Sequence, residues 1–491
     1  MAEHQSDTKS VTIPRHAIYK TKSTTNGVVE RRELIGYPAN ALSQHLTVGE
    51  ADNSKKIEFL LSGDTLVDGK ESYISFKFST NKWTACLSSD ISSVIRKLEI
   101  SLPSNQNQVL ESIDSYGTLQ SMLHMIISGE DSFNSNWYSG LNSMAGYNSG
   151  NGSKSARRWL NLPDEEGGVR TCVMALNLSG IMSNTNYIPL LLLNGLKITI
   201  YLSSASDVLH FDARNEASWN TVIDAVEMPL GKTYATMDAA ERTALQDALI
   251  AFTGKAAPNA APLTYTITSP VYNAMTVWMS SAYIDSLIKA SESTTGVILH
   301  YDTYRFNQIV PQSQHLNFAF TDGVQNLRSV MMACQLRDRG PASHFNYCTN
   351  GMKGFSFRVG SRIYERVNNT CPSMALVSTL VSLGKFGKYH DSSATHTQYP
   401  RSKNVHVFNF EAAKVESATA HSGINTTNGR NLRLEVEFHN TEGESVVSPT
   451  DADLTLMSFT NTVPYRDVHL NTFLDFSKYI RINSQGILVS E

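Results

Sequence analysis

The clearest hydrophobic pattern of the chain occurs twice, about half a chain apart. In residues 196–202 (LKITIYL) and residues 432–438 (LRLEVEF), apolar side chains occupy every second position. An Asn-Gly pair precedes each run, at Asn194-Gly195 and at Asn428-Gly429. Such a pair followed by strict alternation is typical of a turn that leads into a half-buried β-strand. The repeat therefore predicts two equivalent strands and, with them, a duplicated fold.

Further pairs of segments occur in the same order in both halves and favour a duplication. The matched strand segments are Tyr73–Phe78 with His315–Phe320, Ile95–Leu98 with Leu327–Val330, and Leu176–Leu178 with Phe408–Phe410. Apolar residues at helical spacing also occur once in each half, in residues 119–127 and 373–383. We therefore expect two similar β-sandwiches, each with a short helix covering one open end. The apolar run Ile188–Leu193 is expected to be a strand buried on both faces.

Changes of pattern divide the chain into five parts. Residues 1–47 have little apolar periodicity, which predicts an extended arm. Residues 239–252 are rich in strong helix formers and precede a Pro- and Ala-rich stretch, which predicts a helical connector and a linker. The expected parts are the N-terminal arm 1–47, the first sandwich 48–205, the connector 206–262, the second sandwich 263–462 and the C-terminal tail 463–491.

The arm and the tail carry the residues that we expect to contact neighbouring molecules. Basic residues are in slight excess in the arm, and an ordinary solvated tail remains an equally good interpretation. In the tail, apolar side chains form a patch that could dock on a neighbour. The candidate contact residues are Arg15, Lys20, Lys22, Arg31 and Arg32 in the arm and Phe473, Leu474 and Phe476, beside Leu470, in the tail.

Charge and cysteine content exclude several classes of protein. The chain has 41 Lys and Arg against 45 Asp and Glu, so a surface built mainly to hold nucleic acid is not expected. Its five cysteines are scattered without a CxxC pair, which argues against a disulfide framework or a zinc site. The first residues lack a secretion-signal pattern, and no apolar run reaches the ~18 residues that a membrane span needs. We expect a soluble protein from a reduced compartment.

Catalytic and metal-binding motifs are also missing from the sequence. The best metal candidate is His390-Asp391 with His396, but this segment is a polar loop without a further ligand nearby. The acidic run Asp164–Glu166 precedes two glycines and has the composition of a solvated turn. We therefore expect no enzymatic activity, no cofactor and no metal.

Several strands resemble those of a known family. Residues Ser72–Phe78, Val94–Ile100 and Leu110–Ile113 look like the opening of the first roll in capsid proteins of virophages and polinton-like viruses. Residues Phe357–Tyr364, with the later Phe386-Gly387, are similar to their second roll. Over residues 57–460 the chain thus resembles the double jelly-roll major capsid proteins of the tectivirus and adenovirus lineage. It departs from them at residues 365–369, where the family often has a proline-containing turn.

The resemblance implies an all-β fold of two tandem eight-stranded jelly-roll β-sandwiches, with short helices in loops and connector. It also implies a viral major capsid protein whose homotrimers form pseudo-hexagonal capsomers and tile the icosahedral shell of a double-stranded DNA virus. The expected partners are further copies of itself, penton proteins and minor capsid or cement proteins, without sequence-specific nucleic acid. The resemblance leaves an internal membrane open. The expected location is the virion, with assembly inside the host cell.

Two further expectations follow from this sequence. If the arm lies beneath the shell, deleting residues 1–40 should leave trimers intact and weaken shell assembly.

The competing interpretation is a carbohydrate-binding or carbohydrate-processing β-sandwich protein. It requires a groove lined by exposed Trp or Tyr beside two carboxylates. The tryptophans are far apart in the sequence, at Trp83, Trp137, Trp159, Trp219 and Trp278.

Overall fold

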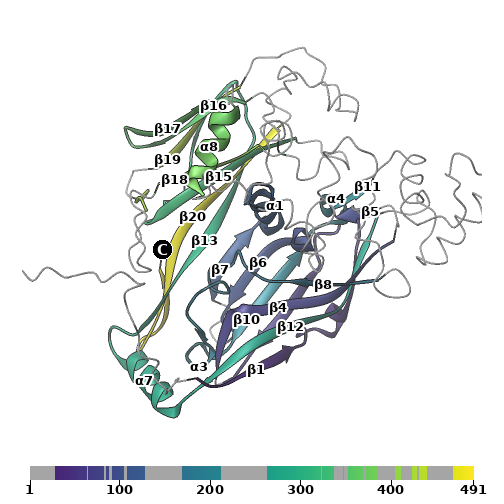
Figure 1. The fold of residues 1–491 in the computed structure, drawn as a ribbon, viewed down its shortest axis with the longest axis vertical. Helices are drawn as coiled ribbons and strands as arrows, with labels where there is room; N and C mark the ends of the chain where they lie inside the picture. Colours follow the sequence, from purple (N-terminus) through teal and green to yellow (C-terminus); the bar gives the residue numbers. More distant parts are fainter. Residues whose placement is uncertain are drawn as a thin grey trace, which may run out of the picture.

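The protein is a pair of β-sandwiches that lie side by side in a computed structural model (Figure 1). We call them the first and the second roll. The structure describes residues 28–63, 65–81, 85–87, 91–103, 108–127, 169–211, 263–321, 323–336, 347, 352–368, 372–383, 404–410, 423–427, 431–438 and 468–490.

The first roll consists of two antiparallel sheets, with strand orders β1-β12-β4-β8 and β3-β10-β6-β7. The short strands β2 and β9 extend the first sheet by pairing with β12 and β4, and β5 pairs with β11 in a small separate sheet. The strands are β1 (Val28–Gly36), β2 (His45–Val48), β3 (Lys56–Leu61), β4 (Leu66–Thr80), β5 (Ala85–Leu87), β6 (Ile95–Ser101), β7 (Val109–Asp114), β8 (Arg170–Met174), β9 (Ile188–Pro189), β10 (Leu196–Leu202), β11 (Leu209–Phe211) and β12 (Tyr265–Met279).

The second roll repeats this arrangement, with strand orders β13-β20-β15-β18 and β14-β19-β16-β17, and β21 pairs with β20. Its strands are β13 (Val297–Ile309), β14 (His315–Ala319), β15 (Leu327–Leu336), β16 (Met352–Val359), β17 (Arg362–Asn368), β18 (Val405–Asn409), β19 (Leu432–Phe438), β20 (Val468–Asn483) and β21 (Gly486–Ser490). The helices of the described chain are η2 (Ala41–Gln44), η3 (Ile91–Val94), α1 (Tyr116–Ile127), α3 (Leu190–Leu193), α4 (Ala205–Val208), α7 (Ser281–Glu292) and α8 (Pro372–Ser382).

Both rolls have the strand order of a jelly roll. Counted along the second roll from β13 to β20, one sheet contains strands one, eight, three and six, and the other contains strands two, seven, four and five. The first roll gives the same order when β1 and β2, which both pair with β12, are taken together as its first strand. The predicted all-β fold of two eight-stranded jelly rolls is confirmed.

The repeated Asn-Gly pattern identifies the correct pair of strands, because β10 and β19 are the seventh strands of their rolls. The two helices are also equivalent, since α1 and α8 each lie between the fifth and the sixth strand. At the first turn the backbone is left-handed, with φ values of 54° at Asn194 and 102° at Gly195. That conformation favours these two residue types.

Two of the other matched pairs are displaced by one strand. Tyr73–Phe78 lies in β4, the third strand of its roll, whereas His315–Phe320 overlaps β14, a second strand. Ile95–Leu98 lies in β6, a fourth strand, and its match Leu327–Val330 lies in β15, a third strand. Strands of a sandwich share one alternation, so the pattern alone does not fix which strand is which.

Strand β12 belongs to the first roll, although we expected residues from 263 onward to open the second. Tyr265 pairs with both Val48 and Thr80, so β12 is a central strand of the first sheet. In a jelly roll the last strand returns to lie beside the first. The prediction assigned β12 to the second roll because its residues directly precede that roll in the sequence. The rolls are therefore linked by β12, α7 and β13, and the helix predicted at residues 239–252 lies outside the described residues.

Three smaller predictions also differ from the structure. Residues 28–36 and 45–47 of the predicted arm lie in β1 and β2, which are strands of the first sheet. The predicted strand Ile188–Leu193 is the two-residue strand β9 followed by one helical turn, α3. The predicted tail contains the central strand β20. The expected apolar patch is wrong, because Phe473, Leu474 and Phe476 are buried in the core of the second roll.

The hydrophobic core is continuous across the two rolls. Along β4 the side chains of Ile74, Phe76 and Phe78 are buried at every second position, as strand geometry requires. Buried side chains of both rolls belong to one cluster. The rolls are therefore expected to behave as one packed unit rather than as two independently moving domains.

Candidate functional site

The described part of the chain holds no group of three His, Cys, Asp or Glu side chains that could bind a metal ion. It also has no helix that is long and apolar enough to cross a membrane. The histidines at 390 and 396 and the acidic run 164–166 lie outside the described residues. The feature of the fold that the sequence did not predict is the contact between the rolls, which we call the inter-roll seam.

The inter-roll seam runs along β13, the edge strand of the second roll. The Tyr301 hydroxyl donates a hydrogen bond to the backbone carbonyl of Leu110 in β7, with an O···O distance of 2.5 Å. Next to it, Nδ2 of Asn184 donates to the backbone carbonyl of His300 at 2.6 Å. Tyr301 is buried, and the carbonyl of the other roll gives its hydroxyl a hydrogen-bond partner there.

Gly180 lets the two backbones approach at the seam. A Cβ built on Gly180 would overlap the backbone carbonyl of Asp302, so a larger residue does not fit without a shift of the backbone. The Asp302 carboxylate is held from the opposite side by an ion pair with Arg328 and by the Ser477 hydroxyl, which donates at 2.7 Å. Asp302 is thereby held by residues of β15 and β20, two other strands of its own roll.

A buried carboxylate supports the first-roll side of the seam. Glu111 of β7 accepts a hydrogen bond from the Ser179 hydroxyl and from two backbone amides, at 2.9 Å from Gly180 and 3.3 Å from Ile181. Burial raises the pKa of Glu111, and the hydrogen bonds from Ser179 and Gly180 act in the opposite direction. Glu111 therefore fixes the position of Gly180, the residue that touches Asp302.

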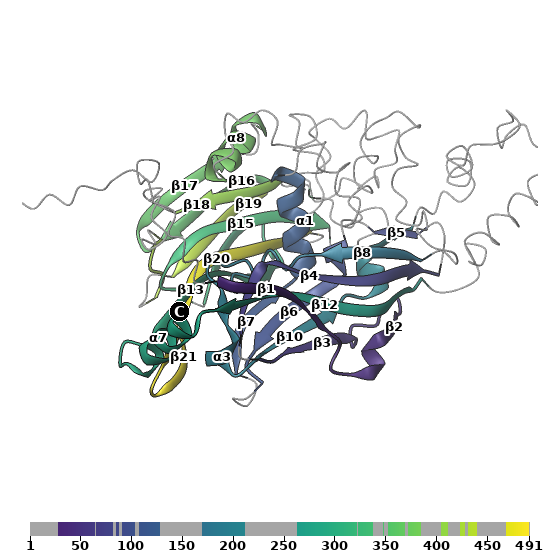
Figure 2. The same cartoon turned by 60° about the horizontal axis from the view of Figure 1, so that its bottom comes forward.

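Helix α1 completes the seam, because it lies between the two rolls in both views (Figures 1 and 2). The buried Tyr347 of the second roll donates from its hydroxyl to the backbone carbonyl of Thr118, at 3.4 Å. The side chains of Gln120 and Ser121 are buried as well as the apolar ones, so most of the helix is covered.

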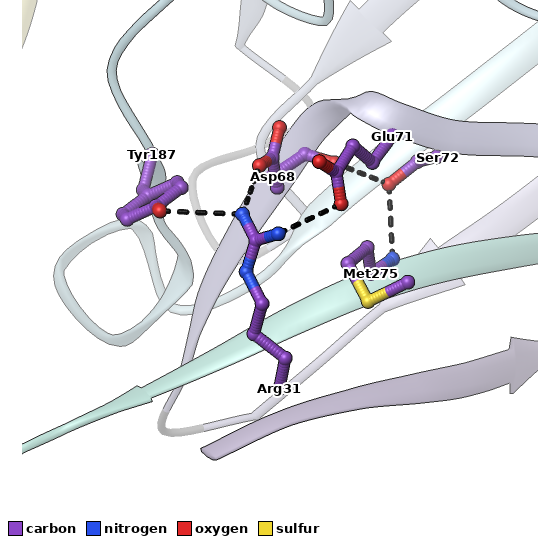
Figure 3. A network of polar contacts seen from close by, with 6 residues as sticks. All are labelled: Arg31, Asp68, Glu71, Ser72, Tyr187 and Met275. Atoms are coloured by element: carbon purple, nitrogen blue, oxygen red, sulfur yellow. Dashed lines mark hydrogen bonds and ion pairs between the residues drawn. The ribbon is translucent and has the colours of Figure 1, made fainter. Parts of the chain in front are cut away.

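The predicted arm residues that the structure describes lie on β1. Arg31 is held by Asp68 at 2.7 Å, by Glu71 at 2.9 Å and by the Tyr187 hydroxyl at 3.3 Å (Figure 3). The hydrogen bonds to Tyr187 and Glu71 raise the pKa of Arg31. Arg32 instead pairs with Glu30 of the same strand at 2.6 Å. Arg31 thus fastens β1 to its own roll.

The remaining candidate contact residues are not brought together with these. Arg15, Lys20 and Lys22 lie outside the described residues, and their role stays a prediction. Figure 3 also shows Ser72, whose hydroxyl accepts a hydrogen bond from the backbone amide of Met275 at 3.0 Å. This bond lies where the register between β4 and β12 shifts, and it joins the two strands there.

A groove of about 710 Å³ lies on the outer face of the second roll. Its charged residues are paired, with 2.7 Å between Lys353 and Glu437 and 3.2 Å between Arg358 and Glu435. No Trp or Tyr lines it. The groove therefore lacks the aromatic platform that a carbohydrate site requires, and each carboxylate is already engaged by a cation.

No known family profile matches the sequence. No curated protein sequence matches it either. Solved structures, in contrast, do match this chain. The VP54 protein of PBCV-1, fitted into a reconstruction of the virophage Sputnik, superposes with a TM-score of 0.54 at 9% identity. The superposition covers 96% of this chain and 99% of that one. The chain has the double jelly-roll fold. A structure of the Sputnik virophage superposes with a TM-score of 0.53 at 9% identity, over 95% of this chain and 89% of that one.

The Faustovirus major capsid protein is a third double jelly-roll relative in structure, with a TM-score of 0.51, 8% identity and coverage of 95% of this chain and 93% of that one. Each of these superpositions covers at least 95% of this chain. The fold that the sequence resemblance implied is therefore confirmed for the two rolls that the structure describes.

Sequence reasoning missed most residues of the inter-roll seam. Glu111 lies between apolar residues of a predicted strand, Leu110 and Ile113, which was the one signal in the sequence for a buried carboxylate. Gly180 and Tyr301 gave no such signal. Their partners are distant in the sequence, and a contact between two sandwiches produces no repeating pattern of apolar residues in the sequence of either one.

Proposed function

We propose that the chain is a viral major capsid protein whose homotrimers form pseudo-hexagonal capsomers and tile an icosahedral shell around a double-stranded DNA genome. The observation that supports this most strongly is the superposition of both rolls on the Faustovirus major capsid protein, with more than nine tenths of each chain covered. The protein would act in the virion as a structural component rather than as an enzyme.

The physical properties of the fold support a shell-forming role. The two jelly rolls share a continuous core, so we expect them to move as one unit. A contact of ~800 Å² per partner is enough for specific association between such units. The inter-roll seam keeps the rolls at a fixed angle, as tiling of identical subunits requires. Further copies of the chain, penton proteins and minor capsid or cement proteins are the partners that this function calls for.

The carbohydrate alternative is not favoured. The groove on the second roll lacks Trp and Tyr, and its carboxylates are paired with Lys353 and Arg358. Of the five tryptophans, Trp278 is the one that the structure describes; it is partly exposed on β12 and does not line the groove on the second roll.

Light scattering coupled to size-exclusion chromatography tests the proposal on the purified full chain. The expected mass is three copies of the 54.2 kDa chain. Negative-stain images should show particles with a six-sided outline, because six similar rolls surround one axis. A chain that stays monomeric at all concentrations, or a particle without this outline, would overturn the proposed function.

A further inference from the structure

Helix α7, which links the two rolls, carries an apolar face that the rolls do not bury. Its apolar residues Tyr283, Ile284, Leu287 and Ile288 recur at spacings of three and four, which places them on one side of the helix. Tyr283 and Ile288 are 42% and 36% exposed. The helix contacts β13 and β20, yet none of its residues is buried. An apolar stripe of this kind normally faces a covering surface. We call it the α7 apolar face.

Acidic residues border the α7 apolar face. Asp285 lies three residues before Ile288 and Glu292 lies four residues after it, so both are its neighbours on the helix surface. Lys289 is the one basic residue of the helix. A segment that covers this face should therefore combine apolar side chains with positive charge.

The N-terminal segment of the chain leaves the first roll beside this helix. Val28, the first residue of β1, pairs with Met279 of β12, and α7 begins two residues later at Ser281. Because β1 and β12 are antiparallel, the chain that precedes Val28 continues in the direction in which β12 leads into α7. Trp278, the neighbour of Met279, is 44% exposed there. Residues before β1 thus start next to the α7 apolar face.

The sequence of that segment complements the face. Residues 8–22, which lie outside the described residues, contain four basic residues and no acidic one. The basic residues are Lys9, Arg15, Lys20 and Lys22, and the large apolar ones are Val11, Ile13, Ile18 and Tyr19. The segment therefore offers both properties that the α7 apolar face and its acidic border require.

The segment is long enough to reach the helix of its own chain. Tyr19 precedes Val28 by nine residues, which span up to about 30 Å when extended. Helix α7 has 12 residues and is therefore about 18 Å long. Tethering also favours this segment over a free one, because it raises the local concentration at the helix.

We propose that residues 8–22 bind the α7 apolar face of the same chain. Ile18 and Tyr19 cover the apolar side chains, and the basic residues of the segment lie beside Asp285 and Glu292. The contact lies within one chain, so it does not depend on the homotrimeric capsomer. Because α7 contributes no buried residue to either core, the contact protects the helix locally and leaves the melting temperature of the rolls unchanged.

Hydrogen exchange of the α7 amides, followed by mass spectrometry, tests the contact. Removing residues 1–27 should raise the exchange rate of residues 281–292 about fivefold and leave that of α8 unchanged. In the full chain, Ile18→Asp should have the same effect. Thr25→Asp is the matched control, because it adds the same charge outside the proposed segment. Equal exchange of α7 in the full and the shortened chain would overturn the contact.

A disulfide test identifies the face and the chain involved. Ile18→Cys is combined with Ile288→Cys, or with Ala282→Cys as the control. Ala282 is exposed, lies opposite the α7 apolar face and is closer to the exit of the segment, so tethering alone favours the control. Peptide mass spectrometry identifies the disulfides formed under mild oxidation. The first pair should form one within a single chain about tenfold faster than the control.

Two outcomes of the disulfide test contradict the proposed contact. Equal rates for the two pairs would show that the segment does not bind the α7 apolar face. A disulfide between Ile18→Cys of one chain and Ile288→Cys of another would show that the face takes the segment of a second copy. Both readings hold whether light scattering finds trimers or monomers, so failure of the proposed function is seen separately.

Discussion

Gly180 of the first roll lies so close to the backbone carbonyl of Asp302 in the second roll that no side chain fits between them. This contact joins segments far apart in the chain. Gly180 is positioned by Glu111, and Asp302 is positioned by Arg328 and Ser477. The angle between the rolls is thus expected to depend on a few residues, which makes the seam accessible to single substitutions.

Replacing Gly180 with alanine should open the seam. The added Cβ overlaps the carbonyl of Asp302, and overpacking of this kind costs ~1–3 kcal/mol. Urea unfolding measures the change. Gly49→Ala is the control, because a Cβ there finds Asp52 Cβ at 3.9 Å and should change stability by less than about 1 kcal/mol. Equal unfolding midpoints for the two variants would show that the seam tolerates the extra atom.

Tyr301→Phe should remove one hydrogen bond between the rolls. The Leu110 carbonyl loses a donor at 2.5 Å in a buried position, which costs roughly 1–3 kcal/mol. Tyr73→Phe is a suitable comparison, since the Tyr73 hydroxyl donates to Glu33 at 2.9 Å on an exposed surface. There water replaces the lost partner and the cost should stay below about 0.5 kcal/mol. Thermal unfolding of both variants decides whether the seam bond has the larger effect.

Strand identity could be predicted from the sequence only where a turn accompanied the alternation. The Asn-Gly pairs mark β10 and β19 because left-handed backbone at Asn194 and Gly195 restricts the residue type. Alternation without such a turn led to matches displaced by one strand. A period of two shows that a segment is half-buried in a sheet, and every strand of a sandwich shares it.

The alternation of apolar residues carried no information on which distant strands are neighbours. Strand β12 pairs with β4, about two hundred positions earlier in the chain, and with β1, about 240 positions earlier. Strand β20 enters the centre of the second roll from the predicted tail. Phe473 and Phe476 looked like a docking patch because the sequence shows that a side chain is apolar but does not show which residues cover it. For the same reason the sequence did not show that Met374, Val377 and Val381 of α8 are exposed.

Acid should destabilise the second roll through His406. Burial lowers the pKa of His406 to about 3, and its Nε2 lies 2.9 Å from Oδ1 of Asn404. A lowered folded-state pKa means that stability is present above the unfolded pKa and is lost as the pH falls. Between pH 8 and pH 5 the loss should be about 2 kcal/mol. His406→Gln, measured by urea unfolding at both pH values, should be less stable at pH 8 and show a smaller loss; parallel losses would contradict the assignment.

Glu111 should have the opposite pH dependence. Burial raises the pKa of Glu111, so its contribution to stability is fully present below the unfolded pKa and declines as the pH rises through the folded value. Glu111→Gln cannot ionise. Relative to this variant, the wild type should lose stability between pH 4.5 and pH 8 in urea unfolding. If the difference between wild type and variant is constant over this range, the carboxyl group does not titrate with a raised pKa.

Deleting the first residues to two different depths should separate the arm from the sheet. Removal of residues 1–27 leaves β1 intact, so trimers should persist at the melting temperature of the full chain. This deletion also removes Arg15, Lys20 and Lys22, and weaker shell assembly at low salt would support their predicted contacts.

Removal of residues 1–40 should do more than we expected from the sequence, because it removes β1. Strand β12 then loses its partner along Tyr272–Met279, and Asp68 and Glu71 lose Arg31. We now expect a lower melting temperature, because the first sheet loses its edge strand. A melting temperature equal to that of the full chain would show that β1 does not stabilise the first roll.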